Sequence, residues 1–302
     1  MKGPAIGIIV SIIAVGGIAS DLHRHSDDPR QSARAFQWVA PVPEGQQLWI
    51  RNTSGRIDVR PATGEQLEVI GERSWRRSDP EALRFVALPH EGGVTICAVW
   101  GAQDEHEGHA RRTAACGPQG EYHVPHGERG DVSANFTVYL PRGVRVDAFT
   151  TNGPIEITGA TAPLRVKSIS GNIEAHTAVG PIVAHTTNGS VRITVDSLAG
   201  TDPVELETVN GSIRAQLPAR LDATLEARTV NGRIESDYEM TLTGRLNPRT
   251  VNAQIGKGGR LLRLATVNGS IRLVRAGDGD AQEAHEQARW APEPRVRVEV
   301  RQ

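Results

Sequence analysis

The chain has 302 residues, with 34 Lys+Arg against 35 Asp+Glu and a formal net charge of −1. This balance provides no basic field, so electrostatics does not point to nucleic acid or an anionic lipid surface, and we predict no nucleic-acid partner. With 38% hydrophobic residues, 32 Gly and only 4% aromatic residues, the composition favours turn-rich β structure over an ordinary α/β enzyme core.

The amino terminus resembles an export segment. Residues 3–19 form an apolar run behind a single lysine, and polar residues follow at once. The run is shorter than the roughly 20 residues of a membrane-spanning helix, and small residues stand where a signal peptidase would cut. We interpret residues 1–20 as a signal peptide or membrane anchor, with a buried core helix as a further alternative. The sequence thus predicts a periplasmic or envelope protein, which an uncleaved segment would anchor to the inner membrane.

The next segments predict a linker and then the start of a β array. Residues 21–45 are polar and contain proline, as linkers do. Residues 46–147 carry strand-like segments separated by turn residues, including an early copy, at residues 52–57, of a motif that recurs later in the chain. We interpret residues 46–147 as first rungs with long insertions that form an N-terminal β cap, because an open end rung leaves strand edges unpaired.

The chain has only two cysteines, Cys97 and Cys116. An oxidising compartment favours a disulfide between them, which would hold the loop 101–115 in place. The alternative is a zinc site, because the pairs His106/His109 and His123/His126 supply suitable ligand types nearby. Neither pair lies on a recognisable helix. We therefore predict the disulfide, and no metal or cofactor.

Residues 148–275 repeat a Thr-x-Asn-Gly-x-Ile unit at intervals of about 20 residues, which is typical of a solenoid. Apolar and polar residues alternate before each Asn-Gly, as in a half-buried strand, and a second short strand follows it. The sequence predicts an all-β fold, a parallel β-helix-like solenoid with rungs of about 20 residues whose successive rungs stack about 4.8 Å apart.

The Asn-Gly pair is expected at a corner of each rung, where glycine adopts positive φ without steric cost. Stacked asparagines would then hydrogen-bond along the axis. Ala253 replaces glycine in one copy, which predicts a differently shaped or strained corner, and Ser170 replaces asparagine in another, which predicts a break in the ladder. The predicted turn ladder consists of Asn152, Gly153, Asn188, Gly189, Asn210, Gly211, Asn231, Gly232, Asn252, Asn268 and Gly269.

The residue before the asparagine position points outward by parity, yet it is apolar and β-branched in most copies. Stacking would align these residues as a stripe on one outer face. Three explanations stay open: strand propensity alone, a cover formed by this chain's own insertion or tail, and a partner surface. The stripe consists of Ile169, Val209, Val230, Val251 and Val267.

The repeat stops after residue 275. Residues 276–302 begin with Gly-Asp-Gly-Asp and are rich in charge, so we interpret them as a charged C-terminal tail.

The repeated unit, together with the segment Tyr139-Leu140-Pro141 just before the array, resembles the bacterial "putative adhesin" family, domain of unknown function 4097. The resemblance runs from about Leu48 to Val274. It implies a β-solenoid and an exported or membrane-tethered envelope protein. It supplies no catalytic residues.

The sequence favours a non-enzymatic function. Cleavage of a glycan needs two or three grouped carboxylates, whereas the outward carboxylates here are scattered one or two per strand, mostly beside arginine. These are Glu156, Glu174, Glu205, Glu207, Glu226 and Glu235. We assign no catalytic residues and predict an exported β-solenoid that acts as a structural or binding, adhesin-like module of the bacterial cell envelope.

Two other functions remain as alternatives. The first is a membrane-tethered accessory or sensor protein of an envelope-stress system, and the second is an enzyme acting on cell-wall glycan. The expected partner is an envelope protein or a surface polymer, self-association is open, and the membrane is contacted only through the N-terminal segment.

Overall fold

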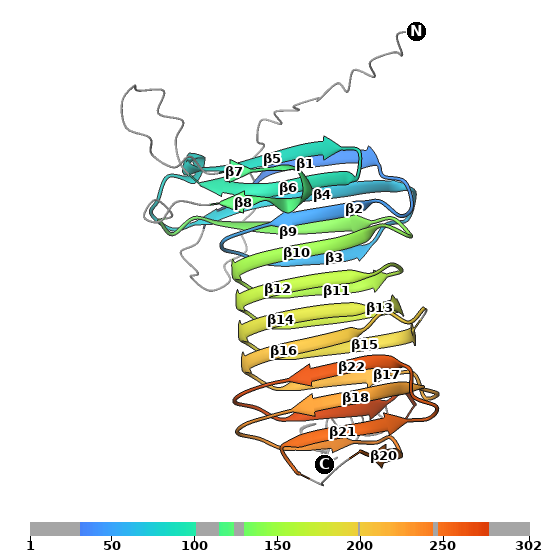
Figure 1. The fold of residues 1–302 in the computed structure, drawn as a ribbon. Coiled ribbons are helices and arrows are strands. Elements are labelled where there is room, and N and C mark those ends of the chain that lie inside the picture. Colours follow the sequence, from blue (N-terminus) through green and yellow to red (C-terminus); the bar gives the residue numbers. More distant parts are fainter. Residues whose placement is uncertain (1–30, 101–114, 124–129, 199, 244–246, 278–302) are drawn as a thin grey trace, which may run out of the picture.

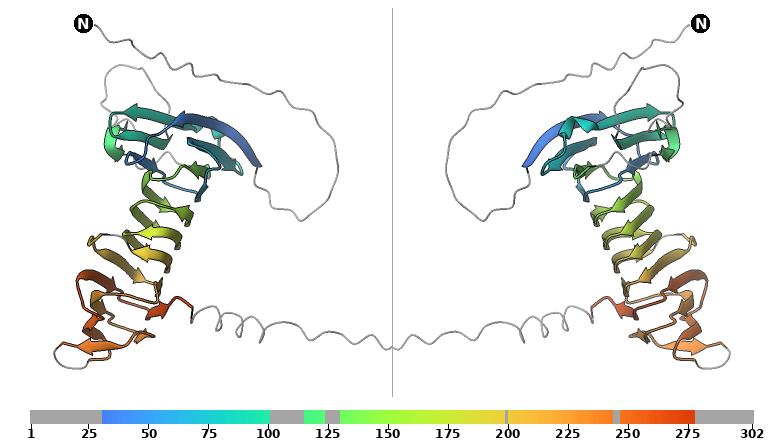
Figure 2. Two further views of the ribbon diagram at one scale, coloured as in Figure 1. Left: turned by 90° about the vertical axis from the view of Figure 1, so that its right-hand side faces the viewer. Right: turned by 90° about the vertical axis from the view of Figure 1, so that its left-hand side faces the viewer.

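The computed structural model describes residues 31–100, 115–123, 130–198, 200–243 and 247–277. The predicted export segment and nearly all of the predicted tail lie outside these residues. Within them the chain forms two long sheets that face each other across an apolar interior (Figures 1 and 2). No helix in this part of the chain is long and apolar enough to cross a membrane.

The two sheets, called sheet A and sheet B, contain most of the strands. In spatial order, sheet A consists of β1 (Gln31–Pro41), β4 (Gln66–Trp75), β9 (Ser133–Leu140), β3 (Ile57–Pro61), β11 (Ile155–Ala160), β13 (Ile173–Gly180), β15 (Val191–Leu198), β17 (Ile213–Leu217), β23 (Ile271–Arg275) and β19 (Ile234–Ser236). Sheet B consists of β20 (Met240–Leu242), β21 (Thr250–Ile255), β18 (Ala223–Arg228), β22 (Arg260–Ala265), β16 (Val204–Asn210), β14 (Ile182–Asn188), β12 (Leu164–Ser170), β10 (Arg145–Asn152), β2 (Gln47–Arg51), β6 (Gly93–Trp100) and β5 (Leu83–His90).

Four smaller elements lie beside the sheets. A hairpin consists of β7 (Ala115–Cys116) and β8 (Tyr122–His123), with the 3-10 turn η2 (Pro118–Gly120) at its tip. A second 3-10 turn, η1 (Pro80–Ala82), precedes β5.

Each central rung pairs one strand of sheet B with the following strand of sheet A, and the rungs stack in parallel. Asn188 of β14 lies opposite Asn210 of β16, so the motif stays in register from rung to rung. Burial alternates along the strands, and the inner positions, such as Leu206 and Ile193, are fully buried. The predicted parallel solenoid is confirmed.

The first position of the motif is Thr or Ser rather than an aliphatic residue because its hydroxyl group forms a hydrogen bond. Its side chain is buried, and its hydroxyl donates a hydrogen bond to the carbonyl of the corner glycine in the neighbouring rung. The distances are 2.9 Å for Thr186 to Gly171, 2.7 Å for Thr208 to Gly189, 2.8 Å for Thr266 to Gly211 and 2.8 Å for Thr229 to Gly269. Each rung is thereby bonded to its neighbour inside the corner as well as along the strands.

The N-terminal end is closed by antiparallel strands. A rung formed by β6 and β9 stacks beyond the rung of β2 and β3, and then β5 and β4 run antiparallel to β6 and β9. The antiparallel additions widen this end of the molecule (Figure 2).

The predicted linker 21–45 is wrong over residues 31–41, which form the outermost strand, β1. This strand pairs antiparallel with β4 from Gln31–Trp75 to Pro41–Gln66. Phe36 and Trp38 pack against the core, and the ring of Phe36 stacks on that of Phe85 with centroids 5.5 Å apart. These two aromatic side chains outweigh the polar composition of the segment.

The C-terminal end does not stack in chain order. The last rung in sequence, β22 and β23, lies between the rung of β16 and β17 and the rung of β18 and β19. Beyond β18, strands β21 and β20 run antiparallel and close sheet B (Figure 1). Antiparallel strands cover the edge that a further parallel rung would have left open.

This arrangement corrects two predicted assignments. Val251 and Asn252 lie in the antiparallel strand β21, where Asn252 is opposite Glu226, so neither belongs to the stacked motif. Val251 is half-buried and packs against the core rather than joining an exposed stripe. Ala253 is 2% exposed and occupies a strand, not a strained corner. The copy in which alanine replaces the corner glycine is therefore the copy that does not form a rung.

Candidate functional site

The corner glycines are required by close stacking more than by positive φ. Gly153, Gly189 and Gly269 have φ of 149°, 159° and 159°, but Gly211 and Gly232 lie outside the positive-φ region, so the prediction is wrong for these two. A Cβ built on Gly211 would lie 2.0 Å from the carbonyl oxygen of Gly189. At Gly232 the corresponding distance to the oxygen of Gly269 is 1.9 Å. The backbones of neighbouring corners thus leave no room for a side chain.

Four of the predicted ladder asparagines hydrogen-bond in series along the axis. Asn210 Nδ2 donates to Asn188 Oδ1 at 2.8 Å, Asn268 to Asn210 at 2.7 Å, and Asn231 to Asn268 at 2.8 Å. In the rung that precedes Asn188, the corresponding residue is Ser170. The asparagine ladder therefore begins at Asn188 and does not include Asn152. The ladder is exposed and holds register; it offers no group for chemistry.

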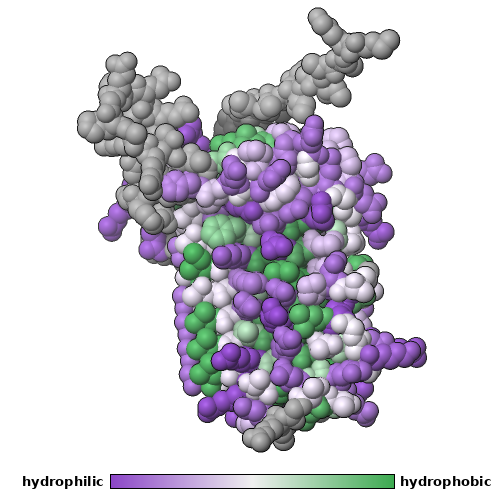
Figure 3. Space-filling view, viewed as in Figure 1, coloured by the Kyte–Doolittle hydropathy of each residue, from purple (hydrophilic) through white to green (hydrophobic). Residues whose placement is uncertain are grey.

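The stripe residues form a shorter ridge than predicted. Ile169, Val209, Val267 and Val230 are 38%, 39%, 38% and 43% exposed, and we call these four residues the ridge. The three valines follow the new rung order, with Val267 between the other two. Hydrophobic surface runs along the edge of the lower half of the array in Figure 3, where the ends of β16, β22 and β18 lie.

A pocket of about 480 Å³ lies on the outer face of sheet B, near the N-terminal end. Outward side chains of β10, β12 and β14 form its floor, and the hairpin of η2 and β8 forms one wall. The two cysteines predicted to pair are joined as a disulfide between Cys97 of β6 and Cys116 of β7, which ties the hairpin to the sheet. No sequence pattern pointed to this pocket, because its residues come from segments far apart in the chain.

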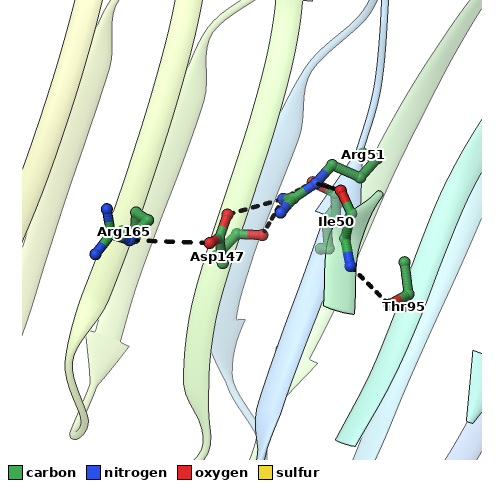
Figure 4. A network of polar contacts seen from close by, with 6 residues as sticks. Ile50, Arg51, Thr95, Asp147 and Arg165 are labelled. Atoms are coloured by element: carbon green, nitrogen blue, oxygen red, sulfur yellow. Dashed lines mark hydrogen bonds and ion pairs between the residues drawn. The ribbon is translucent and has the colours of Figure 1, made fainter. Parts of the chain in front are cut away.

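One arginine joins the pocket wall to its floor. Arg51 Nη1 donates to both Asp147 Oδ1 and the Asp147 carbonyl at 2.8 Å, and Nε donates to the Gly120 carbonyl at 2.8 Å. Its side chain is only 10% exposed, so the pair with Asp147 is well shielded from solvent. Gly120 has φ of 82°, and a Cβ there would meet the guanidinium. Asp147 lies between Arg51 and Arg165 on adjacent strands (Figure 4).

The remaining lining combines cations with an apolar surface. Lys167 is exposed, and Arg165 Nε lies 3.9 Å from Asp147 Oδ2 with 67% of its side chain exposed. Phe149 lies edge-on to Tyr122 with ring centroids 6.4 Å apart. The Tyr122 hydroxyl bonds to Thr53 Oγ1 and to the Ala98 carbonyl, both at 2.7 Å. The aromatic pair is therefore held in place by the cap.

His185 completes the pocket on the side towards β16. Its Nδ1 lies 3.4 Å from Glu207 Oε2, whereas its Nε2 is buried and has no hydrogen-bond partner in the described part of the protein. A buried polar atom without a partner costs free energy, about 1–3 kcal/mol. The ring is thus suited to gaining a partner when something occupies the pocket.

Shifted pKa values occur away from the pocket. Hydrogen bonding by the side chain and the backbone N–H of Ser78 lowers the pKa of Asp131 to about 2. The carboxylate of Asp58, hydrogen-bonded to Arg60 at 2.5 Å, raises the pKa of that guanidinium. Burial lowers the pKa of Arg260. None of these groups lines the pocket, so they stabilise local structure rather than mark a reactive site.

The described residues contain no group of three or more His, Cys, Asp or Glu side chains placed to hold a metal ion. Of the histidines considered for zinc, only His123 lies among them. The disulfide occupies both thiols.

The fold defines a β-solenoid repeat protein with a polar pocket beside its N-terminal cap. Residues 126–274 match the model of the family described as Toastrack DUF4097, so this part of the chain is similar to that family. No curated protein matches the sequence.

Two solved structures are similar to the chain. A putative cell adhesion protein of Clostridium sporogenes ATCC 15579 is 9% identical, with a TM-score of 0.42, covering 80% of this chain and 99% of its own. A putative adhesin of Bacteroides fragilis NCTC 9343 is 10% identical, with a TM-score of 0.33, covering 79% of this chain and 96% of its own.

Proposed function

We propose that the protein is an exported, non-enzymatic binding module of the bacterial cell envelope. The observation that carries this proposal is the pocket on sheet B, which is held open between stacked strands and a disulfide-tethered hairpin. Its volume falls within the roughly 300–1,000 Å³ of small-molecule sites, and its walls belong to regular elements rather than to a long loop. The Toastrack match supports a binding role, and the apolar run at residues 3–19 supports export.

The pocket is poorly equipped for glycan cleavage. Asp147 is the one carboxylate among its described lining residues, and it already accepts hydrogen bonds from Arg51. Hydrolysis by paired carboxylates needs a second carboxyl group about 5–10 Å away across the scissile bond. A single lining carboxylate that is already paired with an arginine favours recognition over catalysis.

Localisation and binding are tested together. The native protein should fractionate with the periplasm or envelope, and mass spectrometry of its N-terminus distinguishes a cleaved signal from an anchor. An intact, membrane-bound N-terminus would favour the accessory or sensor alternative. Purified mature protein should bind isolated envelopes saturably without releasing soluble saccharide. Recovery from the cytoplasm would refute export, and release of saccharide would refute a non-enzymatic role.

A further inference from the structure

We infer that the pocket binds a carboxylated sugar, such as a hexuronic acid residue of a surface glycan; this inference rests on the proposed binding function. The charges, the aromatic surface and the unpartnered imidazole nitrogen of the pocket each restrict the chemical class of the ligand.

The charges around the pocket favour a single negative charge. Arg51, Arg165 and Lys167 contribute three positive charges, and Asp147 and Glu207 contribute two negative charges, which leaves +1. Arg51 and Asp147 neutralise each other at 2.8 Å. Lys167 forms no ion pair within the described part of the chain. A carboxylate placed between Lys167 and Arg165 would balance the excess, because both side chains project from the same face of β12.

The apolar part of the pocket favours a ring rather than a small ion. Phe149 and Val183 lie on strands that flank β12 on either side, so they border the two cations. Phe149 is held by Tyr122, whose own hydroxyl is bonded to the cap. The apolar face of a sugar ring can pack on such a surface while its carboxylate reaches the cations.

The imidazole of His185 supplies a partner for a hydroxyl group. Its Nε2 has no hydrogen-bond partner in the structure as described, although Nδ1 faces Glu207. If the ring turns so that Nε2 faces the pocket, a sugar hydroxyl can either donate to this atom or accept from it. A simple carboxylic acid would lack this contact. The combination of cation, aromatic surface and imidazole is therefore better matched by a sugar acid.

Binding of oligogalacturonic acid to the mature protein, measured by calorimetry at low salt, tests the inference. We expect saturable binding that is at least tenfold tighter than that of a neutral galactose oligomer and of inorganic phosphate. Lys167→Gln and Phe149→Leu should each weaken binding about tenfold. Lys257→Gln, an exposed lysine in a turn far from the pocket, is the matched control and should leave binding unchanged.

Each result decides for or against the inference. Equal binding of the neutral oligomer, tighter binding of phosphate, or equal effects of the two lysine variants would overturn it. If oligogalacturonic acid fails to bind while envelope binding persists in wild type and in Lys167→Gln, the ligand class is wrong and the proposed binding function stands. If envelope binding is also absent, both fail. Circular dichroism of each variant confirms that it is folded.

Discussion

The central rungs and the C-terminal end of the solenoid carry the same motif but use it differently. In the centre, the rungs from β10 to β17 stack in chain order, each on the one before. At the C-terminal end, β22 and β23 insert ahead of β18 and β19, and β21 runs antiparallel. The comparison shows that the motif specifies the shape of a corner without specifying which rung lies next to it.

A single methyl group distinguishes a stacked corner from the antiparallel strand β21. Corner glycines approach the neighbouring glycine carbonyl so closely that any Cβ would lie about 2 Å from the oxygen, as at Gly211. Ala253 cannot occupy such a corner, and its side chain is instead buried in β21. The copy that carries alanine is the copy that closes the array.

The largest effect is expected from a side chain at a central corner. Gly211→Val should destabilise the protein by about 3 kcal/mol or more, because its Cβ would force two rungs apart. Gly232→Val creates the same clash at the terminal rung, which can splay at lower cost, so its loss should be smaller. Urea denaturation measures both. Gly64→Val is the control, since nothing lies within 4 Å of its Cβ. Equal losses of stability in Gly211→Val and Gly232→Val would contradict the expectation that the terminal rung can splay more easily than a central one.

The second-largest loss of stability is expected from removing a buried hydroxyl group. Thr208→Val keeps the shape of the side chain but removes the 2.7 Å hydrogen bond to the Gly189 carbonyl, at a cost of roughly 1–3 kcal/mol. Thr224→Val, at an exposed position of β18, should be nearly neutral. Thermal and urea unfolding of both variants check this, and an unchanged stability for Thr208→Val would mean that the bond contributes nothing to rung stacking.

A smaller effect should distinguish the strand at Ala253 from a corner. Ala253→Gly removes a buried methyl and loosens a strand, so it should destabilise by about 1 kcal/mol. If residue 253 were a corner, glycine would be neutral or stabilising. The sign of the change in unfolding free energy decides between the two arrangements.

The smallest change in stability is expected at the ridge. Val230→Thr with Val267→Thr preserves β-branching, and both side chains are about two fifths exposed, so stability should change by less than about 0.5 kcal/mol. Analytical ultracentrifugation of the double variant tests for self-association. Loss of self-association would identify the ridge as a partner surface. A stability loss well above that value would indicate that another part of the chain covers the ridge.

Much of this architecture could be predicted because it depends on local chemistry. Alternation along each strand places apolar residues inside, and the Asn-Gly pair ends each first strand, so the parallel solenoid follows from the repeat itself. The pairing of Cys97 with Cys116 needed only the cysteine count and the expected compartment. Phe36 and Trp38 were a signal for β1 that the polar composition of the surrounding segment concealed.

Strand order and the pocket were decided only by the tertiary structure. Every rung presents nearly the same edge, so either β22 or β18 could pair with β16. In the structure β22 pairs with β16, and β18 pairs with the far edge of β22. Closure of the open edge settles this order. Arg51 and Asp147 stand 96 residues apart and meet because β2 and β10 are adjacent rungs. The sequence by itself determined the solenoid, since corner geometry and burial are properties of each repeat. The binding surface depends on which repeats become neighbours, and that is a property of the whole array.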